Sequence, residues 1–328
     1  MNDDQLRVHL DRQADLAPVP TPDLAERVLQ RRSASRRRRA GLLGTAIAIV
    51  VLLTGVPLTM AALRPTPTVG ASPSSPPPRA QQNPLGLFGF WSVDAPDVDD
   101  GVLLRLDSRL VVLLGCGPVE GQWQANVGGD FLAGVSSWSG SCSTTTAGLP
   151  WLAEAAGFEF DGADAVLLDA TGTPTARLHL SAPPGPSPDM WPGYTEPPVV
   201  TDADRQRFTG NPALPAGLRP ATTDTMIGRW IPVDNPDSTP FVTFSDDRSW
   251  TGSDGCNGIA GRWQIGTGGA QIGTGGALLG TTGAQTLIGC DYRPIGAWLS
   301  TTALAGFDGD TLVLVGPDGN EIGRLKAG

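Results

Sequence analysis

Residues 251–263 read TGSDGCNGIAGRW, and residues 113–123 read LLGCGPVEGQW. Each stretch contains Gly-Cys, a glycine five residues after the cysteine, and a tryptophan two residues further on. The two stretches lie about 140 residues apart in a chain of 328 residues, which is long enough for two modest domains. The repetition predicts that the chain contains one domain twice.

Other matching residues extend this repeat. Trp91 lies 25 residues before the first repeated cysteine, and Trp230 lies 26 residues before the second. The next cysteines, Cys142 and Cys290, follow after 26 and 34 residues. Most of this difference is explained by residues 264–277, which contain the heptapeptide QIGTGGA twice in succession.

The end of each copy also matches the other. GFEFDGADAVLLDATGTPTARL begins at Gly157, and GFDGDTLVLVGPDGNEIGRL begins at Gly306. Several anchors in the same order are the sequence signature of a duplicated unit. We therefore place the first domain at 85–182 and the second at 224–328.

Each copy is dominated by short β-prone runs bounded by Asp and Gly. In the second copy these runs predict strands at 241–244 and 311–315, with a hairpin turn, PDGN, at 317–320. One helix is expected in each copy, at 149–156 and 294–305. The order of strands, helix and hairpin predicts an α+β fold, with two small antiparallel-sheet domains that each carry one helix.

A run of 24 residues without charge, 40–63, precedes the repeat. About 20 apolar residues are enough to cross a bilayer. Four arginines at 36–39 stand directly before the run, so the positive-inside rule places residues 1–39 in the cytoplasm and the repeat outside the cell. A cleaved signal peptide is the alternative, although 39 residues before the apolar run are long for one. We predict a single transmembrane helix in the cell membrane.

Two further segments are rich in proline. Residues 64–84 predict an extended stalk, and residues 183–223 predict a linker between the two copies. Within the linker, a short helix is expected at 202–208, and Trp191 and Tyr194 are interpreted as residues that dock it onto a domain.

Charge and composition restrict the function. Residues 64–328 carry 14 basic and 27 acidic side chains, a net charge of −13, which argues against nucleic acid or anionic lipid as the ligand. The chain has one lysine, Lys326, against 22 arginines. Together with abundant Ala, Gly and Pro, this bias is typical of a GC-rich genome, such as an actinobacterial one.

The four cysteines lie in matching places, two in each copy. Outside the cytoplasm this arrangement predicts the disulfides Cys116–Cys142 and Cys256–Cys290. In the chain-entropy model each would stabilise its domain by roughly 3 kcal/mol. A redox or metal-binding pair is the alternative, but the sequence has no CxxC motif.

The second copy resembles the META domain, also called the HslJ-like domain. The resemblance rests on SDGCNGIAGRW, on a second cysteine after TLIG, and on the closing hairpin GDTLVLVGPDGNEIGRL. The matching residues are Trp230, Gly255, Cys256, Asn257, Gly261, Trp263, Cys290 and Leu312. The helix after the second cysteine departs from the family, because Trp298 and Ala303 stand where a glutamate is frequent.

The first copy matches the same family less well. It keeps Trp91, Gly115, Gly121 and Trp123, but Gly117 replaces the Asn of the motif and the Asp-Gly turn is missing. The resemblance implies a small antiparallel sheet curled around a helix. It implies no reaction, because members of the family look like envelope proteins tied to stress, motility or drug tolerance.

Few residues offer catalytic chemistry. His179 lies on a predicted closing strand, where we interpret it as structural. Asp246, Asp247 and Asp254 could form a carboxylate pair for glycoside hydrolysis, but they occupy expected turns, where solvated loop residues are favoured. DVDDG at 97–101 lacks the full spacing of a calcium loop. The sequence therefore predicts no catalytic residue, no metal site and no cofactor.

Together these features predict a non-enzymatic, single-pass envelope protein that displays two META-like interaction domains outside the cell, for a protein or envelope ligand that the sequence does not identify. One alternative is a transmembrane signalling protein whose tail, 1–39, binds a cytoplasmic regulator. The other is an extracytoplasmic hydrolase that uses paired aspartates.

Overall fold

The computed structural model describes residues 81–142, 148–185, 190–210, 212–234, 239–266, 275–286 and 294–328. The predicted tail, the predicted membrane helix and the stalk up to residue 80 lie outside these ranges, and so does most of the heptapeptide duplication. Within these ranges, no helix has the length and apolar character needed to cross a membrane.

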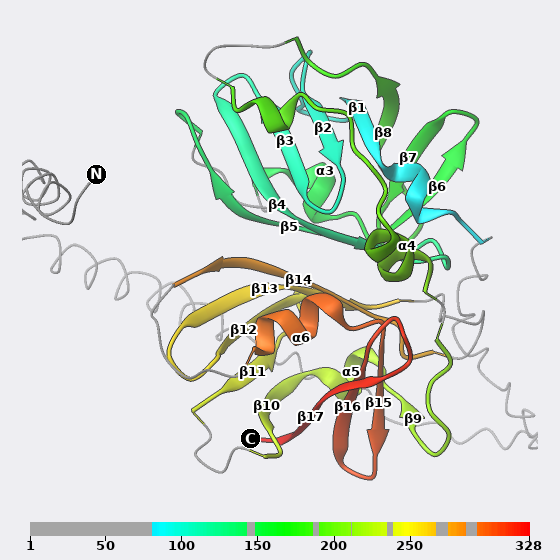
Figure 1. Cartoon of the computed structure of the whole chain (residues 1–328), viewed down its shortest axis with the longest axis vertical. Helices are drawn as coiled ribbons and strands as arrows, with labels where there is room; N and C mark the ends of the chain where they lie inside the picture. The colour runs from blue at the N-terminus through cyan, green and yellow to red at the C-terminus, as the bar shows by residue number, and fades with distance from the viewer. Residues whose placement is uncertain are drawn as a thin grey trace, which may run out of the picture. The chain divides into compact units, whose positions relative to one another are not determined.

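The first half of the described chain folds into one antiparallel sheet of eight strands (Figure 1). The strands are β1 (Gly89–Asp94), β2 (Leu103–Leu106), β3 (Leu110–Leu114), β4 (Gly117–Ala125), β5 (Phe131–Trp138), β6 (Gly157–Asp161), β7 (Asp164–Leu168) and β8 (Pro174–Ser181). Their order is β5-β4-β3-β2-β1-β8-β7-β6. A short 3-10 helix, η1 (Pro84–Leu87), precedes β1, and α3 (Pro150–Ala153) connects β5 to β6.

The outer strands of this sheet, β5 and β6, meet at one end. Asp130 and Gly157 form an antiparallel bridge. The Phe131 amide donates to the Ala156 carbonyl at 3.1 Å, and the Phe158 amide donates to the Gly129 carbonyl at 2.8 Å. The sheet therefore curls until its two edges pair there, which leaves less unpaired backbone exposed.

The second half forms another antiparallel sheet, of nine strands. These are β9 (Arg219–Pro220), β10 (Gly228–Pro232), β11 (Phe241–Phe244), β12 (Ser249–Ser253), β13 (Gly258–Ile265), β14 (Leu278–Gln285), β15 (Leu304–Asp308), β16 (Thr311–Val315) and β17 (Glu321–Ala327). The order, β14-β13-β12-β11-β10-β17-β16-β15-β9, repeats that of the first sheet and adds β9 at one edge. Helix α5 (Thr223–Met226) precedes β10, and α6 (Ile295–Thr301) connects β14 to β15.

The two sheets also repeat hydrogen bonds at equivalent positions. The Trp91 indole donates to the Leu87 carbonyl at the end of η1, and the Trp230 indole donates to the Met226 carbonyl at the end of α5, both at 2.8 Å. A buried indole N–H needs an acceptor. Each tryptophan therefore fixes the short helix before its sheet in the same way.

The place of the inserted residues follows from the same comparison. Trp123 on β4 and Trp263 on β13 lie 140 positions apart, whereas Phe131 and Leu278, the first residues of β5 and β14, lie 147 apart. The difference equals one heptapeptide. The extra residues are therefore accommodated in the connection between β13 and β14, and the strands on either side keep their pairing.

Each sheet encloses its own hydrophobic core. Trp123 is fully buried in the first, with Phe131 at 6.0 Å between ring centroids. In the second, Trp263 packs against Phe244 at 5.0 Å, and Trp250 is fully buried. Burial of such large apolar side chains is the main favourable term for small domains of this size.

The glycine that follows each repeated cysteine by five residues lies where two strands approach closely. A Cβ on Gly261 would overlap the Thr281 carbonyl oxygen and lie 2.5 Å from Nε1 of Trp250. A Cβ on Gly121 would overlap the carbonyl oxygen of Gly134 in the same manner. Both glycines adjoin a register shift in the strand pair, so the repeated motif encodes this close contact.

Several predicted elements are confirmed. Strands occupy 241–244 and 311–315 as expected, and a turn follows at 317–319. The linker helix expected at 202–208 is α4 (Asp202–Thr209), which begins with a capping box between Thr201 and Asp204.

The helices expected at 149–156 and 294–305 are shorter than predicted. Helix α3 ends at Ala153, and α6 ends at Thr301. Thr302 has extended backbone angles, and the chain enters β15 at Leu304. Pairing with β16 and with Ala277 outweighs the helical tendency of these residues.

Among the cysteines, Cys116 and Cys142 form the predicted disulfide, with Cα atoms 5.0 Å apart. Cys256 is also disulfide-bonded. Its predicted partner, Cys290, lies outside the described residues.

Two glycines of β13 provide a matched test of the close contact. We expect Gly261→Ala to lower the free energy of unfolding by about 1–3 kcal/mol, because its methyl group overlaps the β14 backbone. Gly258→Ala should change it by no more than about 0.5 kcal/mol, since a Cβ there meets no atom within 4 Å. Urea denaturation followed by tryptophan fluorescence measures both, and equal midpoints for the two variants would contradict the assignment.

Candidate binding site between the two sheets

The two sheets belong to one compact unit and pack through equivalent strands. Strands β4 and β5 of the first sheet contact β13 and β14 of the second, as Figure 1 shows at the centre of the molecule. An interface in which the same surface of two copies meets is characteristic of two-fold symmetric dimers.

Hydrogen bonds to equivalent backbone carbonyls cross this interface in both directions. Gln124 on β4 donates through Nε2 to the carbonyls of Gly280 and Ser300. Arg262 on β13 donates to the carbonyls of Ala133 and Ala153. Both acceptor pairs are related by the 147-residue offset of the repeat, with Gly280 matching position 133 and Ser300 matching position 153. The interface is therefore pseudo-two-fold.

Two more contacts support this arrangement. Gln264, the equivalent of Gln124, donates to the Ala156 carbonyl at 3.0 Å. Gln122 accepts a hydrogen bond from the Thr282 amide at 3.0 Å. Carbonyls and amides enclosed by the interface thus find partners from the opposite sheet, as buried backbone groups require.

Gly134 and Thr281 occupy equivalent positions and face each other. A Cβ on Gly134 would lie 2.5 Å from the Thr281 hydroxyl oxygen. Thr281 is fully buried, and its hydroxyl has no hydrogen-bond partner within the described part of the chain. The absence of a side chain at one of the two positions allows the sheets to approach at this point.

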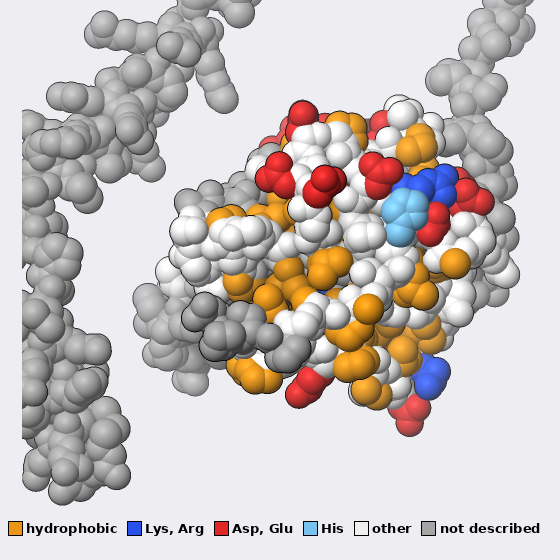
Figure 2. Space-filling view, turned by 90° about the horizontal axis from the view of Figure 1, so that it is seen from above, with side chains coloured by type: hydrophobic (Ala, Val, Ile, Leu, Met, Phe, Trp, Pro, Cys, Tyr) orange, Lys and Arg blue, Asp and Glu red, His pale blue; other side chains and the backbone are white. Residues whose placement is uncertain are grey.

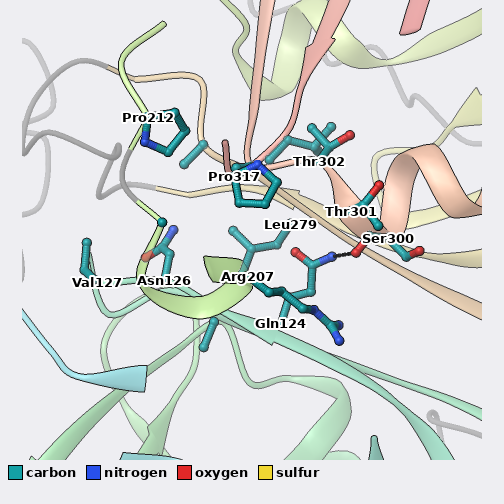
Figure 3. Close-up of a pocket in the computed structure, with 15 residues that line it drawn as sticks. Gln124, Asn126, Val127, Arg207, Pro212, Leu279, Ser300, Thr301, Thr302 and Pro317 are labelled. Carbon is teal, nitrogen blue, oxygen red and sulfur yellow. Dashed lines mark hydrogen bonds between the residues drawn. The ribbon is translucent and has the colours of Figure 1, made fainter. Parts of the chain in front are cut away.

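On either side of this contact the interface contains a cavity. One, shown in Figure 3, measures about 40 Å³ and includes Gln124, Ala277, Ala303 and Pro317. The other measures about 160 Å³. It includes the equivalents of these four residues, namely Gln264, Asp130, Ala156 and Ala170. The cavities are therefore two copies of one site.

The smaller cavity is narrowed by the linker, which contributes Arg207, Gly210 and Pro212 to its wall. Figure 3 shows Arg207 beside Gln124, whose side chain reaches Ser300. The Arg207 guanidinium donates to the Trp123 carbonyl at 2.9 Å. Burial lowers the pKa of Arg207, against an opposing effect of the Asp204 carboxylate.

The larger cavity is lined by charged side chains from both sheets. Asp130 comes from the first sheet and is 1% exposed, and its carboxylate accepts from the Asn126 side chain at 2.9 Å. Asp246 and Arg248 come from the hairpin between β11 and β12. Trp263 also lines the cavity, although only 2% of its surface is exposed. The site combines apolar surface with a few polar groups, as ligand sites commonly do.

The hairpin that carries these charges is longer in the second sheet. In the first sheet, the hydrogen bond that closes the equivalent hairpin, between β2 and β3, runs from the Asp107 amide to the Arg109 carbonyl. In the second sheet it runs from the Ser245 amide to the Ser249 carbonyl. The extra two residues bring Arg248 to the cavity with a φ of 63°, a left-handed conformation that is uncommon for residues other than glycine.

Two arginines meet beside the larger cavity. Arg248 donates to the Ala153 carbonyl at 2.8 Å and to the Ala155 carbonyl at 3.1 Å. Burial, reinforced by the positive charge of Arg248, lowers the pKa of Arg262 to about 10. Both guanidinium groups remain charged at neutral pH, and carbonyl oxygens at the end of α3 accept their hydrogen bonds.

The aspartates considered for hydrolysis are held in turns. Asp247 accepts from the Ser249 amide at 2.9 Å and from its hydroxyl, and these bonds lower its pKa. Asp254 is 6% exposed, so the expectation that it is a solvated loop residue is wrong. Burial raises the pKa of Asp254, but hydrogen bonds from Asn257 and Cys256 outweigh this effect and lower it.

The residues of the GCN sequence have structural positions in the second sheet. The Asn257 amide donates to Asp254 at 2.6 Å, and its side-chain oxygen accepts from the Thr286 hydroxyl at 3.2 Å. Gly255 has a φ of 110° in this turn. The GCN sequence therefore shapes the turn between β12 and β13.

His179 lies at the surface of β8, where 43% of its side chain is exposed. Its Nδ1 lies 3.0 Å from the Asp164 carboxylate, and Arg177 bonds Asp161 at 2.9 Å. Figure 2 shows the histidine in pale blue among basic and acidic side chains. In the second sheet, Arg324 and Asp308 form the ion pair equivalent to that of Arg177 and Asp161, at 3.0 Å.

The last candidate considered in the sequence is the calcium-like stretch at 97–101. Residues 97–101 form an exposed turn, in which Asp97 has a φ of 59°. In the portion of the chain that the structure describes, no cluster of three His, Cys, Asp or Glu side chains is suited to a metal ion.

Sequence reasoning missed the residues that join the two sheets. Gln124 and Gln264 follow the repeated tryptophans directly, in GQWQ and GRWQ. This repeated glutamine is the feature of the sequence from which the residues that join the sheets could have been predicted. Asp130 and Arg248 have no equivalent charged residue in the other copy, so the repeat alone could not identify them.

Comparisons with known proteins add little. No family model matches the chain, and no curated protein matches it significantly. Among solved structures, "Crystal structure of MucB in complex with MucA(peri)" aligns with a TM-score of 0.11 and 12% identity, over 72% of this chain and 85% of that chain. A likeness of this size carries no argument about fold or function.

The contact between Gly134 and Thr281 can be tested by a double-mutant cycle. We expect Gly134→Ala to lower the free energy of unfolding by about 1–3 kcal/mol, because its methyl group meets the Thr281 hydroxyl. In a Thr281→Ala background, where that oxygen is gone, the same substitution should cost at least about 0.5 kcal/mol less. Urea denaturation of the four variants measures this coupling. Equal costs in both backgrounds would show that the two positions do not meet.

Proposed function

We propose that this chain is a non-enzymatic, single-pass membrane protein of the cell envelope, and that its two META-like domains act outside the cell as one binding module. The membrane anchor is inferred from the uncharged run at 40–63 and the arginines at 36–39. The strand order, with β1 beside β8 and a helix between β5 and β6, is compatible with the META-like assignment.

The observation that carries the proposal is the unequal pair of cavities between the sheets. The linker narrows one of them to about 40 Å³, and the other remains open at about 160 Å³. Because both sheets contribute to the open cavity, it exists only when the two domains are joined. A preformed recess at a domain interface is a frequent place for ligands.

The state of the acidic residues favours binding over hydrolysis. Asp247 and Asp254 direct their carboxylates to amides of their own turns. A glycosidase needs two carboxyl groups that flank a substrate bond. Carboxylates that accept hydrogen bonds from their own turns are poorly placed to flank a substrate bond.

In-cell crosslinking with mass spectrometry tests the proposal. We compare the full chain with a version that lacks residues 1–30, and expect both to crosslink to the same envelope or wall proteins through residues 85–328. The reason is that the proposed binding surface lies in the two domains and not in the tail.

The opposite result identifies a different function. Partners that are cytoplasmic and disappear with residues 1–30 would reject the binding module and support a signalling protein that acts through its tail. As a control, deletion of residues 64–80, a shorter segment of the stalk, leaves both the tail and the domains intact.

A further inference from the structure

The outer edge of the second sheet is covered by a short strand from the linker. Strand β9 pairs antiparallel with β15, beside which Figure 1 shows it, and Arg219 stands opposite Phe307. The Arg219 guanidinium lies over the Phe307 ring, 5.2 Å from its centroid. Pro220 stands opposite Gly306, and a Cβ on Gly306 would lie 3.0 Å from the Leu214 side chain. An extended segment with a basic residue therefore closes this edge.

The equivalent strand of the first sheet is β6. Its Phe158 amide donates to the Gly129 carbonyl, and the equivalent bond, 147 positions later at both ends, starts at the Ala305 amide of β15. Phe160 is therefore the equivalent of Phe307. In an antiparallel sheet, the backbone groups that face away from one neighbour recur at every second residue. The amide and carbonyl of Phe160 thus face away from β7, toward the position that β9 occupies on the second sheet.

Within the described part of the chain, no strand pairs with Phe160 on that side. Strand β6 pairs with β7, and its bridge to β5 lies at its first residue. Gln82 matches Ala221 by the 139-position offset between β1 and β10. The Ala221 amide donates to the Ala305 carbonyl at 3.0 Å. The Gln82 amide instead donates to the Val127 carbonyl, in the turn between β4 and β5, at 2.9 Å. Among the described residues, β9 therefore has no counterpart on the first sheet, and Phe160 is partly exposed.

The side chains along this edge of β6 are acidic. Glu159 takes the place of Gly306, but it is exposed and forms no ion pair within the described residues. Asp161 and Asp164 share one arginine, Arg177, at 2.9 and 3.3 Å. Like charges oppose the pairing of two such edges, so a second copy of this chain is a poor partner. A strand that carries positive charge is favoured instead.

We propose that the edge of β6 binds an extended, basic segment of a partner protein as an added antiparallel strand. The segment pairs through its backbone with Phe160 and places an Arg or Lys beside the acidic edge, as β9 places Arg219 beside β15. Main-chain hydrogen bonds to a sheet edge provide affinity, and side chains provide specificity. This inference goes beyond the proposed function, because Glu159 and Phe160 line neither of the two cavities.

A peptide that contains β9 is the probe for this edge. Residues 213–223, ALPAGLRPATT, are synthesised with a fluorophore and titrated with the full-length protein in detergent, and binding is followed by fluorescence anisotropy. We expect saturable binding that weakens as salt is added. A peptide with Arg219→Glu should bind at least fivefold more weakly, because it brings a negative charge to an acidic edge.

Two charge reversals in the protein locate the site. Glu159→Arg should raise the Kd at least fivefold. Asp310→Arg makes the same change of charge at an exposed position in the turn between β15 and β16, and it should change the Kd by less than twofold. Hydrogen–deuterium exchange of residues 157–161 should slow when the peptide is bound. Equal urea midpoints for both variants and the parent show that each protein is folded.

Four results would overturn the proposal. The first two are no saturable binding and equal Kd values for the two variants. The third is slower exchange in residues 304–308 in place of 157–161, which would mean that the peptide displaces β9. The fourth is binding only after deletion of residues 64–80, which would make the stalk the occupant of this edge. If any of these occurs while envelope proteins still crosslink to residues 85–328, the added strand is rejected and the proposed function stands.

Discussion

The rest of the structure depends on how the two sheets satisfy the backbone carbonyls that their interface encloses. Helices α3 and α6 are short, and the last carbonyls of a helix have no partner within it. Gln124 supplies a donor to Ser300 at the end of α6, and Arg262 supplies one to Ala153 at the end of α3. A buried carbonyl without a donor is costly. These crossed bonds therefore fix which strands meet, and in which register, more strictly than apolar contact alone would.

Duplication of one domain creates a symmetric interface, and later differences between the copies make its two cavities unequal. The linker places α4 over the first sheet, and Arg207 narrows the cavity beside it. In the second sheet the hairpin between β11 and β12 is two residues longer, and it brings Asp246 and Arg248 to the opposite cavity. The fold is shared, so any difference in function between the copies must come from these local changes.

Local features of the sequence were sufficient for much of the fold. β-prone runs located β11 and β16, and the short helix expected at 202–208 is α4. The disulfide between Cys116 and Cys142 was predicted because the cysteines occupy matching positions in the two copies and were expected to lie outside the cytoplasm. The helix ends were misjudged because pairing with a distant strand decides where α6 stops. The cavity was not predictable for the same reason, since Asp130 and Arg248 become neighbours of one recess only through long-range packing.

The charged interface has a consequence for how a ligand could act. Burial lowers the pKa of Arg262, which means that part of its hydration has been lost on folding. An interface that encloses such groups gains less from association than an apolar one of equal area. The larger cavity is lined by residues of both sheets, so a ligand bound there would contact both. Because it binds only the joined arrangement, it would stabilise that arrangement by mass action, and occupancy of the recess would be coupled to the rigidity of the whole module.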